Sequence, residues 1–348
     1  MNELEVKTSF LEQLKTLLPQ VDIRSVESNV VLSNKCSADA ILNIKIGSTS
    51  KTLVIEIKSS GEPRRLREAI TYLETAIKQV PGGYPVVVVP YINQTGREIC
   101  MEQGIGFIDL NGNILLSFDS VYIERFGKRD EKVARKRLKR LFSPKSSRIA
   151  RIMLENPNKA WRQIDLAEEA SVSIGLVNLV VGVLEAQEII ERAGIGKILL
   201  RNPTALLDNW VKVYDLSVNT ASDYYLSART PDQVIKKISE AASIKKKRYA
   251  FTVHAGASLV APFVRFQHVH LYTEGDIKLW QDFLGLREVE FGGNVSLLSP
   301  YDEGVFYNSR EINGIEVVGD IQLYLDLYSY PARGREQADF LRQQRLSF

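Results

Sequence analysis

The chain has 348 residues, of which 45% are hydrophobic and 25% charged, and its formal net charge is +3. This length predicts two or three domains, and the composition is that of a soluble globular protein. No apolar run approaches the length of a membrane span, and the acidic N-terminus does not resemble a signal peptide, which disfavours membrane and secreted proteins. Cys36 and Cys100 lack the spacing of a metal site, so we expect a reduced, cytoplasmic protein.

Residues 1–126 predict an α/β domain with elements in the order α-β-β-β-α-β-α-β. The dipeptide Asn111-Gly112 near its end predicts a type I′ hairpin, because Asn-Gly favours left-handed backbone. Expected helices cover residues 4–18, 63–79 and 95–103, and expected strands include residues 38–46, 52–58, 85–90, 104–110 and 114–118.

Three residues in this domain form the most informative pattern. Asp39 lies on one predicted strand, and Glu56 and Lys58 lie on the next. Side chains alternate along a strand, so Glu56 and Lys58 point the same way, and pairing of the two strands would bring Asp39 toward Glu56. Two carboxylates suit Mg²⁺, and an ammonium beside them suits the charge that develops in phosphodiester hydrolysis.

The spacing resembles the PD-(D/E)xK motif of restriction-endonuclease-like nucleases, with Ala38 in place of the motif's proline. The resemblance implies that Asp39 and Glu56 are catalytic metal ligands, with Mg as cofactor if the site is active. It also implies that Lys58 orients or activates the attacking water. Glu5 or Glu12 of the first helix could complete the metal shell. The alternative is structural, because alternating Glu and Lys also occur on solvated strand faces and guard sheet edges.

Residues 127–146 form a predicted basic linker. Such a run is usually a solvated helix, but clustered cations also release counterions from nucleic acid and can therefore follow its phosphates. The basic run extends from Lys128 and Arg129 through Lys132, Arg135, Lys136, Arg137, Lys139, Arg140 and Lys145 to Arg148 and Arg151, against Asp130 and Glu131. The candidate DNA contacts in the linker are Arg135, Lys136, Arg137, Lys139 and Arg140.

Residues 147–202 have the proportions of a winged helix-turn-helix domain, with helices expected over residues 148–155, 162–170 and 174–187. Two strands, 189–192 and 197–201, flank a glycine-containing turn that would be the wing. The third helix would enter the major groove and offers Ser173 and Asn178 but no cation. Phosphate contacts would come from Arg162, Arg192 and Lys197. A helix so poor in cations is equally consistent with a packing or dimer surface.

Residues 203–348 predict a third, α/β domain. Around residues 249–272 we expect a strand, a turn of small residues, a helix and a second strand, an order that resembles a nucleotidyltransferase core. Active members of that fold place D-x-D on the second strand, where this chain has His268-x-His270. Neutral imidazoles do not replace carboxylates for Mg²⁺, so we expect an inactive scaffold. A zinc site that adds His254 is the alternative.

The C-terminal segments Gly292-Gly293-Asn294-Val295-Ser296 and Val317-Val318-Gly319-Asp320, with the winged helix ahead of them, resemble AbiEi-type antitoxins of type IV toxin–antitoxin systems. The resemblance implies a DNA-binding regulator that represses its own operon. It also implies neutralisation of a nucleotidyltransferase toxin without a stable complex, and an oligomer is possible.

Two functional hypotheses follow from these patterns. The first is a transcriptional regulator of antitoxin type, which we favour. The second is a Mg²⁺-dependent DNA endonuclease of a defence system, which uses the winged helix as its targeting module. Both hypotheses predict binding to double-stranded DNA.

Overall fold

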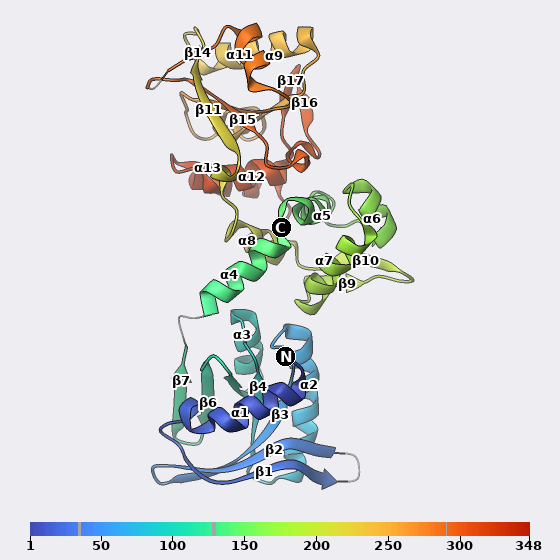
Figure 1. The fold of residues 1–348 in the computed structure, drawn as a ribbon, viewed down its shortest axis with the longest axis vertical. Helices are drawn as coiled ribbons and strands as arrows, with labels where there is room; N and C mark the ends of the chain where they lie inside the picture. The colour runs from blue at the N-terminus through green and yellow to red at the C-terminus, as the bar shows by residue number, and fades with distance from the viewer. Residues whose placement is uncertain (34–35, 127–129, 290) are drawn as a thin grey trace. The chain divides into compact units, whose positions relative to one another are not determined.

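The computed structural model describes residues 1–33, 36–126, 130–289 and 291–348, with the backbone alone for residues 130–134. These residues divide into two compact units, Met1–Lys136 with Val183–Glu188, and Arg137–Gly182 with Ile189–Phe348. The architecture is mixed α/β with several sheets, as predicted (Figure 1). Lys128 and Arg129 of the basic run, and the side chain of Lys132, lie outside the described residues.

The N-terminal unit is built on one mixed sheet in the strand order β1-β2-β3-β4-β5-β6-β7. The β3–β4 and β4–β5 pairs are parallel, and the other neighbouring pairs are antiparallel. The elements are α1 (Glu3–Leu17), β1 (Asp22–Ser33), β2 (Cys36–Ile46), β3 (Thr49–Ile57), α2 (Pro63–Ala76), the 3-10 helix η1 (Ile77–Gln79), β4 (Tyr84–Val89), α3 (Gln94–Glu102), β5 (Gly106–Asp109), β6 (Ile114–Phe118), β7 (Val121–Arg125) and α4 (Asp130–Leu141).

Helices cover both faces of this sheet, which explains why its central strands are apolar throughout. On one face Val6 and Phe10 of α1 pack in the same core as Ile55 and Ile57 of β3. On the other face Leu66 of α2 lies in a second core with Val54 of β3 and Val87 of β4, because side chains alternate between the two faces along each strand. The charged residues that follow this buried stretch of β3 therefore stand at the end of a rigid, two-sided core.

The hairpin between β5 and β6 corrects the prediction of a type I′ turn. Gly112 has a left-handed backbone with φ +90°, but Asn111 does not, and both central residues of a type I′ turn require it. The connecting loop is instead organised by Asp109, which is fully buried. Its carboxylate accepts hydrogen bonds from the backbone N–H groups of Ile92, Asn111 and Asn113. The loop is thus fixed by a side chain rather than by turn propensity.

The second unit contains α5 (Pro144–Glu155), β8 (Trp161–Arg162), α6 (Gln163–Glu169), α7 (Ile174–Ala186), β9 (Ile190–Arg192), β10 (Lys197–Leu200), α8 (Pro203–Val211), the 3-10 helix η2 (Leu216–Val218), β11 (Thr220–Tyr225), α9 (Pro231–Lys245), β12 (Tyr249–Thr252), α10 (Val253–Val260), β13 (Val269–Thr273), α11 (Ile277–Leu284), β14 (Arg287–Glu288), β15 (Val295–Ser299), the 3-10 helix η3 (Glu303–Phe306), β16 (Arg310–Ile312), β17 (Ile315–Val317), α12 (Asp320–Ser329) and α13 (Gly334–Arg345).

Helices α5, α6 and α7 accompany a small antiparallel sheet in the order β8-β10-β9, in which β8 lies between α5 and α6 along the chain and β9 and β10 follow α7. Val177, Val181 and Leu184 recur at helical spacing on α7 and are buried, as the sequence predicts. The β9–β10 hairpin is also confirmed, with positive φ at Gly194 and Gly196. Of the helices that the structure describes, none is alone long and apolar enough to cross a membrane. The α6–α7 pair meets those criteria only jointly and is bent by 115°.

The C-terminal sheet has the order β14-β11-β15-β13-β12-β17-β16. Its β13–β15 and β12–β17 pairs are parallel, and the others are antiparallel. Helices α9 and α11 lie on one side of the sheet, and α12 and α13 lie on the other (Figure 1). Helix α10 begins at Val253, directly after β12, so the small residues that predicted a turn belong to a helix instead.

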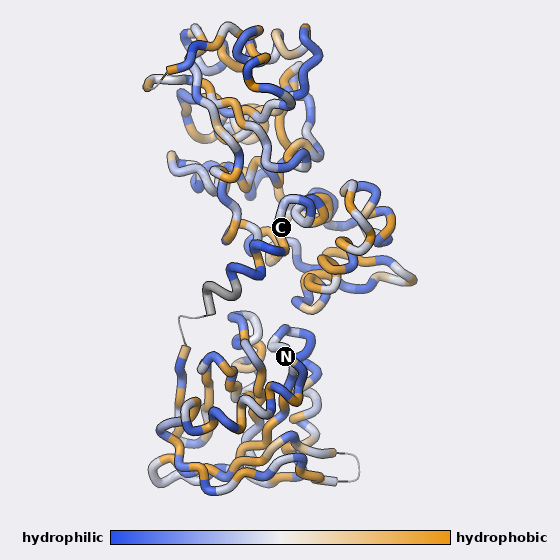
Figure 2. Tube along the Cα trace, in the orientation of Figure 1, coloured by the Kyte–Doolittle hydropathy of each residue, from blue (hydrophilic) through white to orange (hydrophobic). Residues whose placement is uncertain are grey.

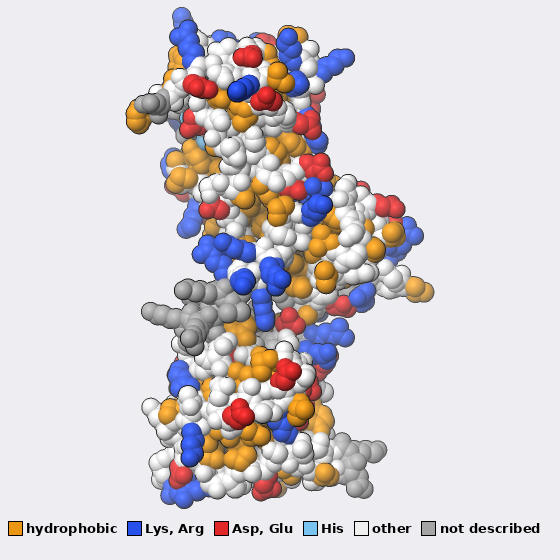
Figure 3. All heavy atoms as spheres, in the orientation of Figure 1, with side chains coloured by type: hydrophobic (Ala, Val, Ile, Leu, Met, Phe, Trp, Pro, Cys, Tyr) orange, Lys and Arg blue, Asp and Glu red, His pale blue; other side chains and the backbone are white. Residues whose placement is uncertain are grey.

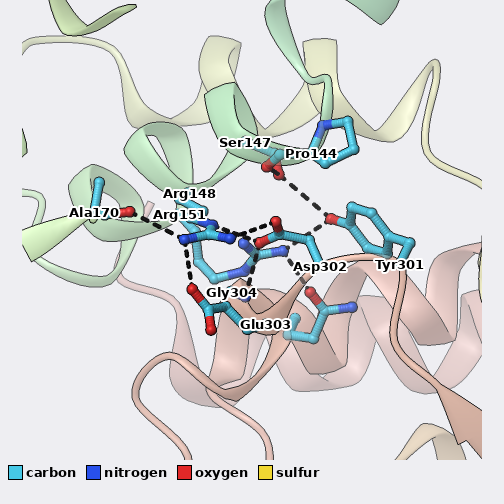
Figure 4. Close-up of polar contacts among 10 residues, drawn as sticks. Pro144, Ser147, Arg148, Arg151, Ala170, Tyr301, Asp302, Glu303 and Gly304 are labelled. Atoms are coloured by element: carbon cyan, nitrogen blue, oxygen red, sulfur yellow. Dashed lines mark hydrogen bonds and ion pairs between the residues drawn. The ribbon is translucent and has the colours of Figure 1, made fainter. Parts of the chain in front are cut away.

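Three charged side chains bind α5 to the C-terminal sheet layer, and Figure 4 shows two of them, Arg148 and Arg151. The Arg148 guanidinium donates two parallel hydrogen bonds of 2.7 Å to the Asp302 carboxylate, and Glu155 accepts the backbone N–H of Ile321 at the start of α12. Arg151 is fully buried and donates to Gln322 Oε1 at 2.7 Å. Neither arginine of the predicted basic run on α5 is therefore a solvated cation, because both are committed to the fold.

Gln322 connects Arg151 to a second buried charge. Its Nε2 donates to Asp326 Oδ1 at 2.8 Å, and Tyr272 and Thr252 also donate to the Asp326 carboxylate. Burial raises the pKa of Asp326 from its ordinary 3.8 to about 6, although these hydrogen bonds act in the opposite direction. An amide thus separates a buried cation from a buried carboxyl group.

This pKa predicts a pH-dependent stability. Because the folded chain binds the Asp326 proton more tightly than the unfolded chain does, the stabilisation is complete below about pH 4 and is lost as the pH rises through 6. Relative to Asp326→Asn, which does not titrate, the wild-type free energy of unfolding should fall by about 3 kcal/mol between about pH 3 and about pH 7. Urea denaturation of both proteins at several pH values measures the difference, and parallel pH profiles would contradict it.

Candidate active site and nucleic-acid interface

Asp39 stands where strands β2 and β3 begin to separate. The antiparallel register pairs Ala40 with Ile55, and extending it by one residue places Asp39 opposite Glu56. Instead of continuing the backbone ladder, Asp39 uses its side chain: Oδ2 accepts the N–H of Ile57 at 2.7 Å. The carboxylate is therefore held at the edge of the paired region, beside the side chains that follow along β3.

Glu56 and Lys58 point the same way, as the strand alternation predicts. Lys58 Nζ lies 2.6 Å from Glu56 Oε1, and Glu56 is only 7% exposed. Burial raises the pKa of Glu56, while the hydrogen bond and charge of Lys58 partly offset this effect. Burial alone would lower the pKa of Lys58, but the bond to Glu56 and the charges of Glu56, Glu3 and Asp39 raise it. The ammonium therefore stays charged beside the carboxylates.

The first helix contributes a different carboxylate from the two that the sequence suggested. Glu3 Oε1 lies 4.0 Å from Lys58 Nζ, whereas Glu5 forms a capping box with Asn2 at the start of α1. Within the described residues, Glu12 makes no hydrogen bond or ion pair with this set. Sequence spacing alone could not identify Glu3, because its place depends on how α1 packs against the sheet.

The donor set fits a magnesium ion. Asp39 and Glu56 each have one oxygen that accepts no hydrogen bond from the described residues, and carboxylate oxygens are the ligands that Mg²⁺ prefers. Within the same part of the chain, no group of three or more His, Cys, Asp or Glu side chains is arranged to hold a metal. Two carboxylates plus water is a common Mg²⁺ environment, so the pair is sufficient for such a site.

The cations predicted to contact DNA from the basic linker lie on α4. The side chains of Arg135, Lys136, Arg137, Lys139 and Arg140 are all exposed. The C-terminal half of this helix is coloured hydrophilic in Figure 2, and Lys and Arg side chains gather over it in Figure 3. The arrangement gives one helix a dense positive surface.

On the small sheet of the second unit, the structure brings two of the predicted cations together. Arg162 on β8 lies directly opposite Lys197 on β10, so their side chains share a face. Asp165 pairs with Arg162 at 2.6 Å, and this bond lowers the pKa of Asp165, with Lys197 acting in the same direction. Arg192 lies opposite the buried Ile198 and therefore projects from the other face.

The start of α7 carries the two predicted polar contacts. Ser173 Oγ accepts the N–H of Leu176 at 3.3 Å, so it also caps the helix, a role that the sequence analysis missed. Asn178 is exposed, and its amide has no hydrogen-bond partner in the described part of the chain. A hollow of about 560 Å³ at this end of α7 is lined by residues that include Lys145, Ser173 and Ile174. Lys145 adds a cation that was not among the predicted contacts.

The three histidines belong to the C-terminal domain, His254 on α10 and His268 and His270 at the start of β13, and the side chains of His254 and His268 are held by hydrogen bonds. His268 Nε2 lies 2.7 Å from Ser296 Oγ, and His254 Nε2 lies 2.7 Å from the carbonyl of Ala332. Burial lowers the pKa of His270 to about 3, so that imidazole is neutral at pH 7. The zinc alternative stays a prediction, and among the described residues no group of three or more His, Cys, Asp or Glu side chains is placed to hold a metal ion.

Comparison with solved structures gives two low-scoring similarities. One is a structure of EndoMS in apo form, 14% identical, with a TM-score of 0.23, 31% of this chain covered and 46% of that chain. The other is an EndoMS–dsDNA2 complex, 15% identical, with a TM-score of 0.24, 30% of this chain covered and 43% of that chain. The chain thus spans less than half of either EndoMS chain, and similarity at this level carries no argument.

Two further comparisons concern sequence. No curated protein matches the chain. Residues 199–347, which contain the C-terminal sheet and its helices, match the family described as "Transcriptional regulator, AbiEi antitoxin, Type IV TA system".

Proposed function

We propose that the chain is a DNA-binding transcriptional regulator of antitoxin type. The observation that carries this proposal is the match of residues 199–347 to the AbiEi antitoxin family, which is a family of transcriptional regulators. By analogy with that family, the chain represses its own operon and counteracts a nucleotidyltransferase toxin without forming a stable complex. On this view the boundaries are residues 1–126, 127–146, 147–202 and 203–348 for the nuclease-like domain, the basic linker, the winged helix and the antitoxin-type domain.

The DNA-binding part of the proposal places a winged helix-turn-helix at residues 147–202. Helices α6 and α7, with the short turn at Ser171 between them, take the place of the helix-turn-helix, and the β9–β10 hairpin takes the place of the wing. Lys145 beside the start of α7 and the Arg162–Lys197 pair on the sheet supply cations for phosphates. Helix α4 adds a second positive surface.

In the C-terminal domain, the proposal is a nucleotidyltransferase-like scaffold without transferase chemistry. His268 and His270 occupy the strand positions where an active enzyme would carry metal-binding carboxylates, and His270 is neutral in its buried setting. The domain would therefore serve recognition or positioning of the winged helix rather than catalysis.

A second candidate function rests on the geometry of Asp39, Glu56 and Lys58. A Mg²⁺ ion held by the two carboxylates would supply Lewis-acid activation of water and of the scissile phosphate. Asp39 is fixed by the N–H of Ile57, and Lys58 is fixed on Glu56. The charged Lys58 ammonium then stands where it can stabilise the negative charge that develops on the phosphate.

The regulator proposal predicts salt-dependent binding to DNA from upstream of its own gene. Reversing three exposed cations of α4, with Arg135→Glu, Lys136→Glu and Lys139→Glu together, should weaken binding and flatten its dependence on salt. If all three contact phosphates, the slope of log K against log salt should decrease by about 2 to 3. Fluorescence anisotropy with the full chain between 50 and 200 mM salt, about the range over which phosphate contacts are most evident, measures both quantities.

The matched control reverses two exposed lysines of α9 and the exposed lysine that caps its C-terminus, with Lys236→Glu, Lys245→Glu and Lys246→Glu, which changes the net charge equally. It should leave the salt slope much closer to the wild-type value. Equal effects of the two triple variants would mean that net charge alone acts. An unchanged slope in the α4 variant would remove that helix from the interface.

The nuclease candidate predicts Mg²⁺-dependent cutting of duplex DNA by the purified chain. Asp39→Asn, which retains an acceptor for the Ile57 N–H, and Lys58→Ala should each abolish cutting, while Lys78→Ala, at an exposed lysine of η1, should not. Thermal unfolding of each variant separates lost chemistry from lost folding. Cutting that persists in Lys58→Ala would mean that a contaminating nuclease is present. No cutting by the wild type would leave the regulator as the one remaining proposed function.

A further inference from the structure

The exposed face of α7 has an unusual composition for a helix that contacts DNA. At about 100° per residue, Ile174, Gly175, Asn178, Leu179 and Gly182 fall within an arc of about 140°. All five are exposed, with Leu179 at 71% and Ile174 at 42%. The opposite face packs into the core through Val177, Val180, Val181 and Leu184, whereas Val183 is exposed. These five residues are apolar side chains, glycines and one amide, and the charge that α7 places within the same arc is that of Glu185, near its C-terminal end, with its side chain 21% exposed.

Base pairs differ in what they offer to such a surface. A guanine is usually contacted by Arg or Lys through its O6 and N7 atoms, and this arc contains neither residue type. An adenine offers N6 and N7 to the two-pronged amide of Asn or Gln, and a thymine offers a methyl group to apolar side chains. Asn178 supplies the free amide, and Ile174 and Leu179 supply the apolar contacts on either side of it.

The two glycines fit the close approach of a partner better than they fit the helix. Neither has a positive φ, and a Cβ atom added at Gly182 would meet nothing within 4 Å. A Cβ atom at Gly175 would meet only Ser173 Oγ, at 4.0 Å. Glycine destabilises a helix interior relative to alanine. Since neither packing nor backbone conformation requires these glycines, they leave the helix backbone open around Asn178.

The positive groups at the N-terminal end of this face favour contact with a polyanion over contact with the same face of a second copy of the chain. Lys145 and Glu168 both line the hollow beside Ser173 and Ile174, so its side-chain charges balance, and the N-terminal end of α7 adds the positive end of the helix dipole. Asp165 offsets part of the charge of the Arg162–Lys197 pair on the adjoining sheet. Residues 174–182 carry no charge, and a reading surface of this kind with cations and a positive helix end beside it is complementary to base edges flanked by phosphates.

We propose that the exposed face of α7 reads A·T base pairs in the major groove, with Asn178 contacting adenine and with Ile174 and Leu179 contacting thymine methyl groups. The inference rests on the DNA binding proposed above and adds the base-pair class that is recognised. It makes Asn178 the specificity-determining residue of the helix and assigns its apolar neighbours to base contacts rather than to a protein interface.

The test is selection of bound duplexes from a randomised library by the full chain, wild type and Asn178→Ala. The wild type should enrich A·T pairs at the positions under α7. In Asn178→Ala the enrichment of adenine over the other bases should fall about tenfold at one of these positions. Gln344→Ala, at an exposed amide on α13, is the matched control and should keep the wild-type preference. Gly175→Leu adds a side chain into open space and should fold normally, yet lose at least about tenfold in affinity.

The outcomes separate the two proposals. Binding with G·C enrichment, or with an adenine preference that survives Asn178→Ala, would overturn the A·T inference and leave DNA binding intact. Absence of duplex binding by every protein at low salt would overturn both. The alternative partner of this face is a second copy of the chain, and sedimentation of wild type and Leu179→Ala tests it. A change of oligomeric state in Leu179→Ala, with DNA selection unaffected, would assign the face to contacts between copies of the chain.

Discussion

Burial of Arg151 is the constraint on which the second unit depends. Burying a guanidinium costs several kcal/mol unless its surroundings compensate. Here Gln322 accepts one hydrogen bond at 2.7 Å, Trp210 offers its ring face at 4.9 Å, and Asp326 supplies a negative charge through Gln322. Two guanidinium nitrogens, Nε and Nη1, still lack a hydrogen-bond partner among the described residues. A side chain this demanding fixes α5 in one position on α12.

As a consequence, α5 packs in two parts of the second unit. It is the first helix of the segment that we propose to bind DNA, and it is also part of the layer beside the C-terminal sheet, to which Arg148 and Glu155 add further contacts. A change in the packing of α12 would therefore reach the proposed DNA-binding helices through α5, and Tyr307, which donates to Glu169 of α6 at 3.0 Å, makes a second connection. The N-terminal unit carries separate chemistry, since Asp39, Glu56 and Lys58 are positioned by its own strands.

Local patterns predicted those features that depend on neighbours in sequence. Strand alternation placed Glu56 and Lys58 on one face, and the turn glycines placed the β9–β10 hairpin. Features fixed by distant residues were missed. Arg151 looked like one more cation of a basic run because its acceptor, Gln322, lies 171 residues away. Glu3 depends on how α1 packs, and the buried carboxylate of Asp109 overrode the turn preference of Asn111-Gly112.

Hydrogen–deuterium exchange in the full chain with Arg151→Met tests the role of α5 most directly, because methionine keeps much of the volume but removes the buried charge and its hydrogen bonds. If α5 couples the two layers, amide exchange should accelerate in α12 and in α6 and α7 together, relative to the wild type. Faster exchange confined to α12, with α6 and α7 unchanged, would contradict the coupling and separate the proposed DNA-binding helices from the C-terminal sheet.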